Sequence, residues 1–358
     1  MPFICAHQLP LTYGPTTTAC HNTACHPLTI SNRPHPFPTM PSCLDILIDA
    51  AESADGKMPS SMPKAFFTAS LDKKDTIMSI SALLKEEEQH MCHHDYLRGS
   101  SSMKVAVARR AKVCQWIFDA VHCFRLHRET AIVAISYLDR FLCSSSKRAV
   151  QARCNPREYQ LVAMACLYIA IKISSEVIEI DASTISGLSR GLQTAEDIIS
   201  CSRDILASLR WEIQGPTPFQ YVSYMLELLP DDTVSMEVAT KLCDDSYRQV
   251  ELAVEDYACV ILRRSSVAVG SFLNSLSRVA EDDFPSNKRN KFIDMISKAF
   301  ELDVLESQLI KTVRGRLLDI DRSLLESNFN SSEQNQESIL SKPLEATNVE
   351  ETPICLPV

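Results

Sequence analysis

The sequence predicts an all-helical protein. Long stretches repeat apolar residues with the 3.6-residue period of a helix, few segments alternate as strands do, and the chain has only 8 glycines. Apolar residues make up 45% of the 358 residues, which allows two domains of ordinary size, each with its own core. The clearest pattern runs from residue 108 to residue 174, where three apolar helical segments follow one another.

The predicted helices begin after a polar N-terminal segment. Residues 1–75 are rich in Pro, Thr, Ser, His and Cys, have little apolar surface to bury, and are expected to be disordered. A first helix is expected from about Asp75 to His90. The next helix carries an apolar stripe with the i, i+3, i+4, i+7, i+8 spacing of a core-facing helix, formed by Val113, Trp116, Ile117, Ala120 and Val121.

Three charges stand where the helical pattern predicts few. Arg110 precedes the apolar stripe, and Asp139 lies inside the apolar run 135–142. Lys172 ends the run 161–171, which contains no charge. A buried arginine and a buried aspartate are tolerated mainly as a pair, because an unpaired buried charge is costly. We therefore interpret Arg110 and Asp139 as structural, whereas nothing in the local pattern requires a cation at Lys172.

A later helix has a clear start, and the chain then reaches a domain boundary. Thr194 is a good N-cap, and Asp197 three residues on is placed to complete a capping box. The run 215–218 (Gly-Pro-Thr-Pro) ends the domain, because proline cannot donate to a helix and restricts the residue before it. The first helix and the first helical domain are thus expected over residues 76–216.

A second helical domain is expected over residues 217–322. Its five predicted helices are Phe219–Leu229, Ser235–Val254, Ser265–Val279, Asn287–Phe300 and Val304–Leu318. Residues 323–358 form a polar, acidic tail that is expected to be disordered.

The composition argues against several classes of function. The net charge of −9 disfavours general nucleic-acid binding, which usually needs a basic stripe. The longest uncharged run is too short for a bilayer, which needs ~20 residues, and the N-terminus lacks the pattern of a signal peptide, so no membrane association is expected. The nucleotide-binding patterns G-x-x-x-x-G-K and G-x-G-x-x-G do not occur, and no cofactor is expected.

Cysteine and histidine are frequent, but their spacing does not indicate a site. The 14 cysteines include no C-x-x-C pair, so reduced thiols are expected. One cluster spans residues 90–94 and another spans residues 20–26, and neither has a second matching pair at zinc-binding spacing. No metal site is expected, and no catalytic constellation is recognised, so the chain is not expected to be an enzyme.

These residues resemble the cyclin family. The resemblance to a first cyclin box covers about residues 80–220 and is carried by Arg110-Ala111, Trp116, Tyr137 to Leu142, Gln160-Leu161-Val162 and Lys172. Residues 86–90 and 95–97, together with Leu209-Arg210-Trp211 and Thr217-Pro218-Phe219, are similar to the D-type cyclins of plants and algae. A weaker resemblance continues to about residue 320.

The resemblance implies a fold and a function. The fold would be two tandem five-helix cyclin-fold domains preceded by an N-terminal helix, with Arg110 and Asp139 as a buried salt bridge between the first two box helices. The function would be that of a regulatory subunit that binds and activates a cyclin-dependent serine/threonine kinase and forms a heterodimer with it. The resemblance also implies a nuclear location, with some of the protein in the cytoplasm.

The resemblance further implies which residues contact the kinase. The lysine that matches Lys172 binds main-chain groups of the kinase αC helix in cyclins, whereas a lysine at a helix C-terminus also caps its own carbonyls, and both interpretations stay open. Cyclins pair this lysine with a glutamate, and Ser202 occupies that position here. Glu176 and Asp204 are the candidates to compensate. The surroundings of the contact would be Ile169, Ile173, Arg203, Leu206 and Trp211.

Two further sites are implied less directly. A docking patch for substrate or inhibitor peptides would involve Arg109, Val113, Trp116 and Gln160, but Arg109 and Lys112 replace two apolar groups of the family patch. Thr352 precedes a proline and is similar to the phosphorylation sites in rapid-turnover tails of cyclins, although such a pair also occurs by chance. The alternatives to a kinase activator are a cyclin-fold transcription adaptor and a cyclin-like protein that does not activate a kinase.

Overall fold

The computed structural model describes residues 72–92, 95–98, 102–174, 180–230 and 234–323. All of them lie in one compact unit, residues 40–358. The described residues form α-helices and short 3₁₀ helices and contain no strand, so the predicted all-helical class is confirmed. Of the predicted disordered tails, residues 1–75 and 323–358, the parts 1–71 and 324–358 lie outside the described residues, whereas residues 73–75 and 323 are helical, so the prediction is wrong for them.

The first described helix is α2 (Lys73–Glu87), which continues into the 3₁₀ helix η2 (Glu88–His90). It begins two residues before the predicted Asp75, because the Asp72 carboxylate accepts a hydrogen bond from the Lys74 backbone N–H and caps the helix there. Its Ile80 side chain is fully buried.

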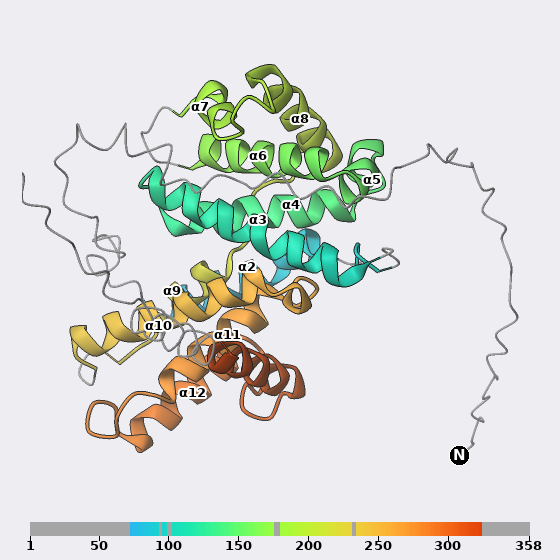
Figure 1. The fold of residues 1–358 in the computed structure, drawn as a ribbon. Coiled ribbons are helices and arrows are strands. Elements are labelled where there is room, and N and C mark those ends of the chain that lie inside the picture. The colour runs from blue at the N-terminus through green and yellow to red at the C-terminus, as the bar shows by residue number, and fades with distance from the viewer. Residues whose placement is uncertain (1–71, 93–94, 99–101, 175–179, 231–233, 324–358) are drawn as a thin grey trace, which may run out of the picture. The chain divides into compact units, whose positions relative to one another are not determined.

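Six helices follow, and five of them surround the sixth, α6 (Figure 1). They are α3 (Met103–Cys123), α4 (Arg128–Cys143), α5 (Lys147–Cys154), α6 (Pro156–Ile173), α7 (Ala182–Gly187) and α8 (Ala195–Ser208). The central helix α6 packs against α3, α4, α5, α7 and α8. It starts at a well-formed cap, since the Asn155 side chain accepts from the backbone N–H of Arg157 and Pro156 occupies the first helical position. The separate short helix α5 was not predicted from the sequence.

The predicted start of α8 is confirmed. The Thr194 hydroxyl accepts from the Asp197 backbone N–H, and the Asp197 carboxylate accepts from the Thr194 backbone N–H. The two bonds form a capping box in which aspartate takes the place of the usual glutamate or glutamine. This cap fixes where α8 begins and therefore which of its residues face α6.

The second bundle follows the proline-rich linker. It contains α9 (Pro218–Glu227), α10 (Met236–Glu255), the 3₁₀ helix η3 (Tyr257–Cys259), α11 (Arg264–Leu276), α12 (Ser286–Ala299) and helical residues 308–323. The first four α-helices begin and end within a few residues of the predicted bounds. The last one starts at residue 308 rather than at Val304, because residues 304–306 form a turn in which the Asp303 carboxylate accepts the N–H of Glu306.

The buried residues form two core clusters, one per bundle, and they interlock at the junction. Tyr257 from η3 packs into the first cluster, whereas Ile80 from α2 and Ile132 from α4 pack into the second. Although α2 precedes the first bundle in the chain, it packs against α9 and α12 of the second. The Glu87 carboxylate at the end of α2 also accepts hydrogen bonds from the Ser265 N–H and hydroxyl at the start of α11.

Cys92 and Cys143 are joined by a disulfide, so the prediction of reduced thiols is wrong for this pair. The bond links the segment after η2 to the last residue of α4, across 51 positions of sequence. Sequence spacing could not reveal a pair that only the folded bundle brings together.

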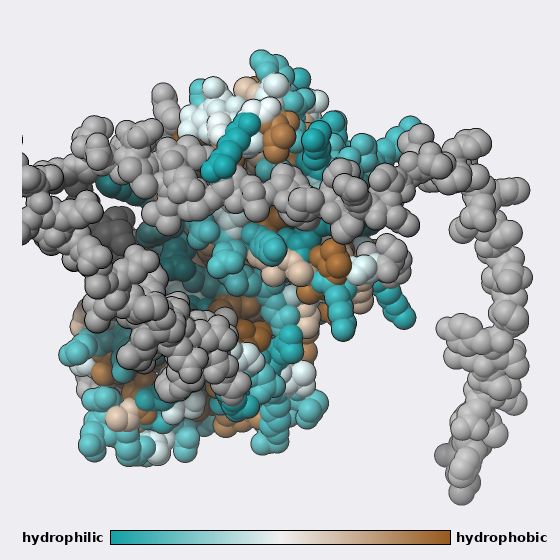
Figure 2. Space-filling view, viewed as in Figure 1, coloured by the Kyte–Doolittle hydropathy of each residue, from teal (hydrophilic) through white to brown (hydrophobic). Residues whose placement is uncertain are grey.

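The surface in Figure 2 is mostly hydrophilic, with apolar atoms emerging in patches over both bundles. This is the pattern of amphipathic helices that turn their apolar stripes inward. Within the described residues, every helix is too short or too polar to traverse a bilayer.

The contact between α11 and the last helix depends on Gly270. A Cβ atom added at Gly270 would lie 2.7 Å from Cγ1 of Val313, whose side chain is buried and stiff. We expect Gly270→Ala to lower the free energy of unfolding by about 1–3 kcal/mol through overpacking, measured by urea denaturation. Gly315→Ala is the control, because the space around Gly315 is open and alanine favours a helix. Equal stability of the two variants would contradict the packing argument.

Candidate functional site

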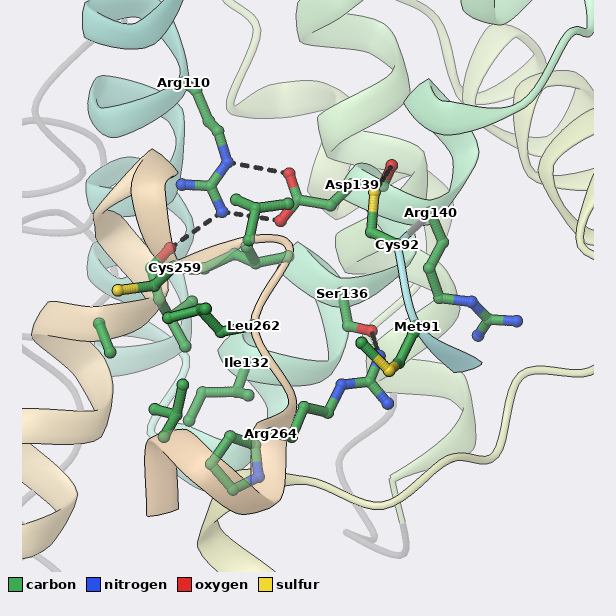
Figure 3. A pocket seen from close by; sticks show the side chains of 16 residues that line it. Met91, Cys92, Arg110, Ile132, Ser136, Asp139, Arg140, Cys259, Leu262 and Arg264 are labelled. Atoms are coloured by element: carbon green, nitrogen blue, oxygen red, sulfur yellow. Dashed lines mark hydrogen bonds and ion pairs between the residues drawn. The ribbon is translucent and has the colours of Figure 1, made fainter. Parts of the chain in front are cut away.

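A buried ion pair joins α3 and α4 (Figure 3). Arg110 Nε donates to Asp139 Oδ1 at 2.9 Å, and Arg110 Nη2 donates to Asp139 Oδ2 at 2.7 Å, a bidentate pair. Only 1% of the Arg110 side chain is exposed. The guanidinium also donates to the backbone carbonyls of Val254 and Glu255 at the end of α10. The pair therefore joins the two bundles as well as two helices.

Further groups complete this polar cluster. Tyr96 donates its hydroxyl to Asp139 Oδ1 at 2.7 Å, and both burial and the Asp139 charge raise the pKa of Tyr96. Burial alone would lower the pKa of Arg110, but the Asp139 carboxylate outweighs it and the pKa of Arg110 rises. Arg110, Asp139 and Tyr96 all have hydrogen-bond partners within the fold. The cluster is consequently a structural element without a free group for chemistry.

Lys172 differs from that pair because its charge faces outward. It lies in the last turn of α6 and is exposed. Its ammonium lies 5.7 Å from the ring centroid of Tyr168, and it makes no hydrogen bond or ion pair with any residue that the structure describes. Within the described part of the chain, Lys172 donates no hydrogen bond to the backbone carbonyls at the end of its own helix, as a capping lysine would. Lys172 thus presents a cation to whatever binds the end of α6.

The residues that could pair with Lys172 are arranged differently from the prediction. Ser202 is buried, and its hydroxyl donates to the Ile198 carbonyl on its own helix at 2.7 Å. Asp204 forms an ion pair with Arg148 at 3.2 Å, so it does not compensate for the missing glutamate. Glu176 lies outside the described residues.

One acidic residue near Lys172 was missed by the sequence argument. Asp181 is the N-cap of α7, and hydrogen bonds from Thr184 lower its pKa, to which the charge of Lys172 adds a smaller effect. The N-cap pattern marks Asp181 as a helix start but gives no sign of its position beside the end of α6. Only the folded arrangement of α6 and α7 reveals the electrostatic interaction.

The remaining predicted residues around Lys172 divide into core and surface. Ile169 is buried in the first core and Leu206 packs against that core, so both lie beneath the exposed residues of the site. Arg203 is exposed. Ile173 is 36% exposed and Trp211 is 67% exposed, which leaves two large apolar side chains at the surface. An exposed tryptophan of this extent is typical of binding surfaces.

The turn that carries Trp211 is strained. Arg210 and Trp211 have φ values of 55° and 61°, so two consecutive non-glycine residues adopt the left-handed backbone conformation. Such a conformation costs of order 1–3 kcal/mol per residue and occurs often at functional sites. The turn after α8 therefore keeps Trp211 exposed in a backbone conformation that is energetically unfavourable.

A cavity of about 690 Å³ lies at the end of α6. It is bounded by the end of α6, the start of α4, the residues before α9 and the end of α2, and Ile173 and Ile213 are part of its lining. Glu86 and Glu129 add negative charge to the lining. No sequence pattern indicates this cavity, because its walls come from four segments that are far apart in the chain.

Most residues of the predicted peptide-docking patch are buried. Val113, Trp116 and Gln160 are buried, and Arg109 is partly exposed on the same helix as Val113. Thr352, the predicted phosphorylation site, lies outside the described residues. Among the residues that the structure describes, no group of three or more His, Cys, Asp or Glu side chains is arranged to hold a metal ion.

Several known proteins are similar to this chain in sequence. The cyclin N-terminal domain family matches residues 78–214. Cyclin-D4-2 of Oryza sativa subsp. japonica is 32% identical over 153 residues, which are 42% of this chain and 39% of that protein. Cyclin-D2-2 of the same plant is 23% identical over 248 residues, 66% of this chain and 65% of that protein. The matches thus span between about two fifths and two thirds of these relatives.

A solved structure is also similar. A viral cyclin from herpesvirus saimiri aligns with a TM-score of 0.49 at 16% identity, over 69% of this chain and 97% of that chain. The matched family domain contains the Arg110–Asp139 pair, the central helix α6 and its terminal lysine. Residues 78–214 thus match the cyclin N-terminal domain family, and the chain is similar to D-type cyclins.

Proposed function

We propose that this protein is the regulatory subunit of a cyclin-dependent serine/threonine kinase, which it binds and activates. The observation that carries the proposal is Lys172, a cation at the exposed end of a buried central helix with no ion-pair partner among the described residues. Similarity to the cyclin family supports a regulatory role without catalysis by the chain itself.

The surroundings of Lys172 fit a helix of another protein better than a small molecule. The exposed side chains of Ile173 and Trp211 provide apolar anchors, and the 690 Å³ cavity that Ile173 lines can receive a projecting side chain. Lysine donates three hydrogen bonds, which suits the backbone carbonyls at the end of a partner helix. We infer that α6, α8 and the strained turn at Trp211 form the face that holds the kinase αC helix.

Activation follows from differential affinity. A kinase is active when its αC helix is turned inward, so that the glutamate of that helix pairs with the active-site lysine. A rigid surface that binds only the inward position shifts the kinase toward the active conformation. The interface is expected to fall in the range of roughly 2,000–5,000 Å² that is typical of signalling assemblies.

A second candidate is a cyclin-like protein that does not activate a kinase. Ser202 favours it, because this residue bonds to its own helix and offers no charge to orient Lys172. A neutral hydrogen bond contributes ~0.5–1.5 kcal/mol and a charged one ~1.5–3 kcal/mol, so the difference is small relative to a whole interface. We therefore expect altered affinity rather than loss of binding.

A pull-down from extract of the source cells tests the proposal. The native chain is expected to recover a protein kinase, and Lys172→Glu is expected to recover at least tenfold less. A charge mismatch buried in an interface costs about 2 kcal/mol or more, which exceeds the ~1.4 kcal/mol that corresponds to a factor of ten. Lys241→Glu, an exposed lysine on α10, is the matched control and should behave as the native chain does. Recovery of the same kinase by all three forms would place the contact elsewhere, and recovery of none would favour the second candidate.

A further inference from the structure

A second, smaller cavity lies at the junction of the two bundles and carries an excess of positive charge (Figure 3). Its volume is about 80 Å³, and its charged lining consists of Arg110, Arg140, Arg264 and Asp139. Both oxygens of Asp139 are already bonded to Arg110, and one also accepts from Tyr96. Two guanidinium groups, those of Arg140 and Arg264, therefore remain without a carboxylate of their own in the lining.

The hydrogen bonds of Arg264 go only to neutral acceptors. It donates to the carbonyls of His90 and Pro216 and to the hydroxyl of Ser136. Against the larger effect of burial, the charge of Glu87 acts to raise the pKa of Arg264, and both Glu87 oxygens accept hydrogen bonds from Ser265. In the described residues, no carboxylate comes within 4 Å of the Arg264 guanidinium.

Arg140 also has no carboxylate partner within the described residues. It donates to the backbone carbonyl of Glu212. In Figure 3 the Arg140 and Arg264 side chains extend to the same side of the cavity, away from the Arg110–Asp139 pair. Burial and the neighbouring Arg264 charge lower the pKa of Arg140 to about 10, and burial lowers the pKa of Arg264. The two charges thus destabilise each other.

We propose that this cavity binds a small inorganic oxyanion, phosphate or sulfate, between Arg140 and Arg264. Each guanidinium offers a planar fork of N–H donors that suits an oxyanion. The cavity has room for such an ion, because one water needs only about 10–15 Å³ on the same measure. An anion at this position would relieve the repulsion between the two arginines and bridge α4 of the first bundle to α11 of the second.

Isothermal titration of the full chain with inorganic phosphate tests the proposal, in an amine sulfonate buffer at ionic strength held constant with chloride. We expect saturable binding of one phosphate, competition by sulfate, and a melting temperature that rises with phosphate concentration. Phosphoserine should bind more weakly than phosphate, since the cavity leaves little room for an ester group.

Two arginine variants identify the site. Arg140→Gln should weaken phosphate binding by about tenfold or more, because it removes a charge-assisted donor. Arg153→Gln is the matched control, since Arg153 also donates to a backbone carbonyl, that of Leu142, but does not line the cavity. Absence of saturable phosphate binding by the native chain would overturn the proposal, as would equal affinity of Arg140→Gln and the native chain.

Discussion

Arg110→Ala is expected to lower the free energy of unfolding by about 3–5 kcal/mol, because the substitution leaves Asp139 as a buried charge without its counterion. Tyr96 alone would still donate to that carboxylate. The carbonyls of Val254 and Glu255 would lose their donor at the same time, which weakens the junction between the two bundles. For a chain of this size the loss corresponds to a fall in melting temperature of roughly 6–20 °C.

The control for this experiment is another arginine that joins two distant segments. Arg263 on α11 pairs with Glu88 at 3.0 Å, but both side chains are largely exposed, and Arg263→Ala should cost no more than about 1 kcal/mol. The double variant Arg110→Met with Asp139→Asn should be more stable than Arg110→Ala, since neither residue then carries a charge. A melting curve for Arg110→Ala that matches the control would refute the structural role of the pair.

Glu87→Ala is expected to cost about 2–4 kcal/mol, because the buried N–H and hydroxyl of Ser265 would lose their acceptor. This N–H is one of the free donors in the first turn of α11, so the carboxylate of α2 acts as its cap from another helix. The variant also removes the carboxylate whose charge raises the pKa of Arg264 most.

The neighbouring residue supplies a matched control. Glu88→Ala removes an exposed carboxylate that pairs only with Arg263 among the described residues, and its effect should stay below about 1 kcal/mol. Glu87→Gln, which keeps one acceptor oxygen, should fall between the native chain and Glu87→Ala in urea denaturation. Equal stabilities of the two alanine variants would show that α2 does not cap α11.

The helices themselves could be predicted from the sequence because they depend on local rules. The cap at Thr194 and Asp197, the proline linker before α9 and the apolar stripe of α3 are all encoded by neighbouring residues. The helix α5 was missed because it has eight residues and a polar composition, which gives no apolar period to detect.

The arrangement of the candidate site could be predicted only in part. The position of Lys172 at the end of a buried helix follows from the sequence, since a charge ends an uncharged run. The pairing of Asp204 with Arg148 and the position of Asp181 near Lys172 depend on how α5, α7 and α8 pack around α6. The same holds for the cavity beside Ile173 and for the disulfide at Cys92, whose parts are brought together only by tertiary contacts.

The most direct test of the proposed function is a titration of the recovered kinase with the purified chain, followed by phosphorylation of a protein substrate. We predict that kinase activity rises with the concentration of the native chain and saturates at one cyclin per kinase. Lys172→Glu should need at least tenfold higher concentration for the same stimulation, while its circular dichroism spectrum and melting temperature match those of Lys241→Glu. Stimulation by Lys172→Glu equal to that by the native chain, or no stimulation by the native chain, would contradict this account.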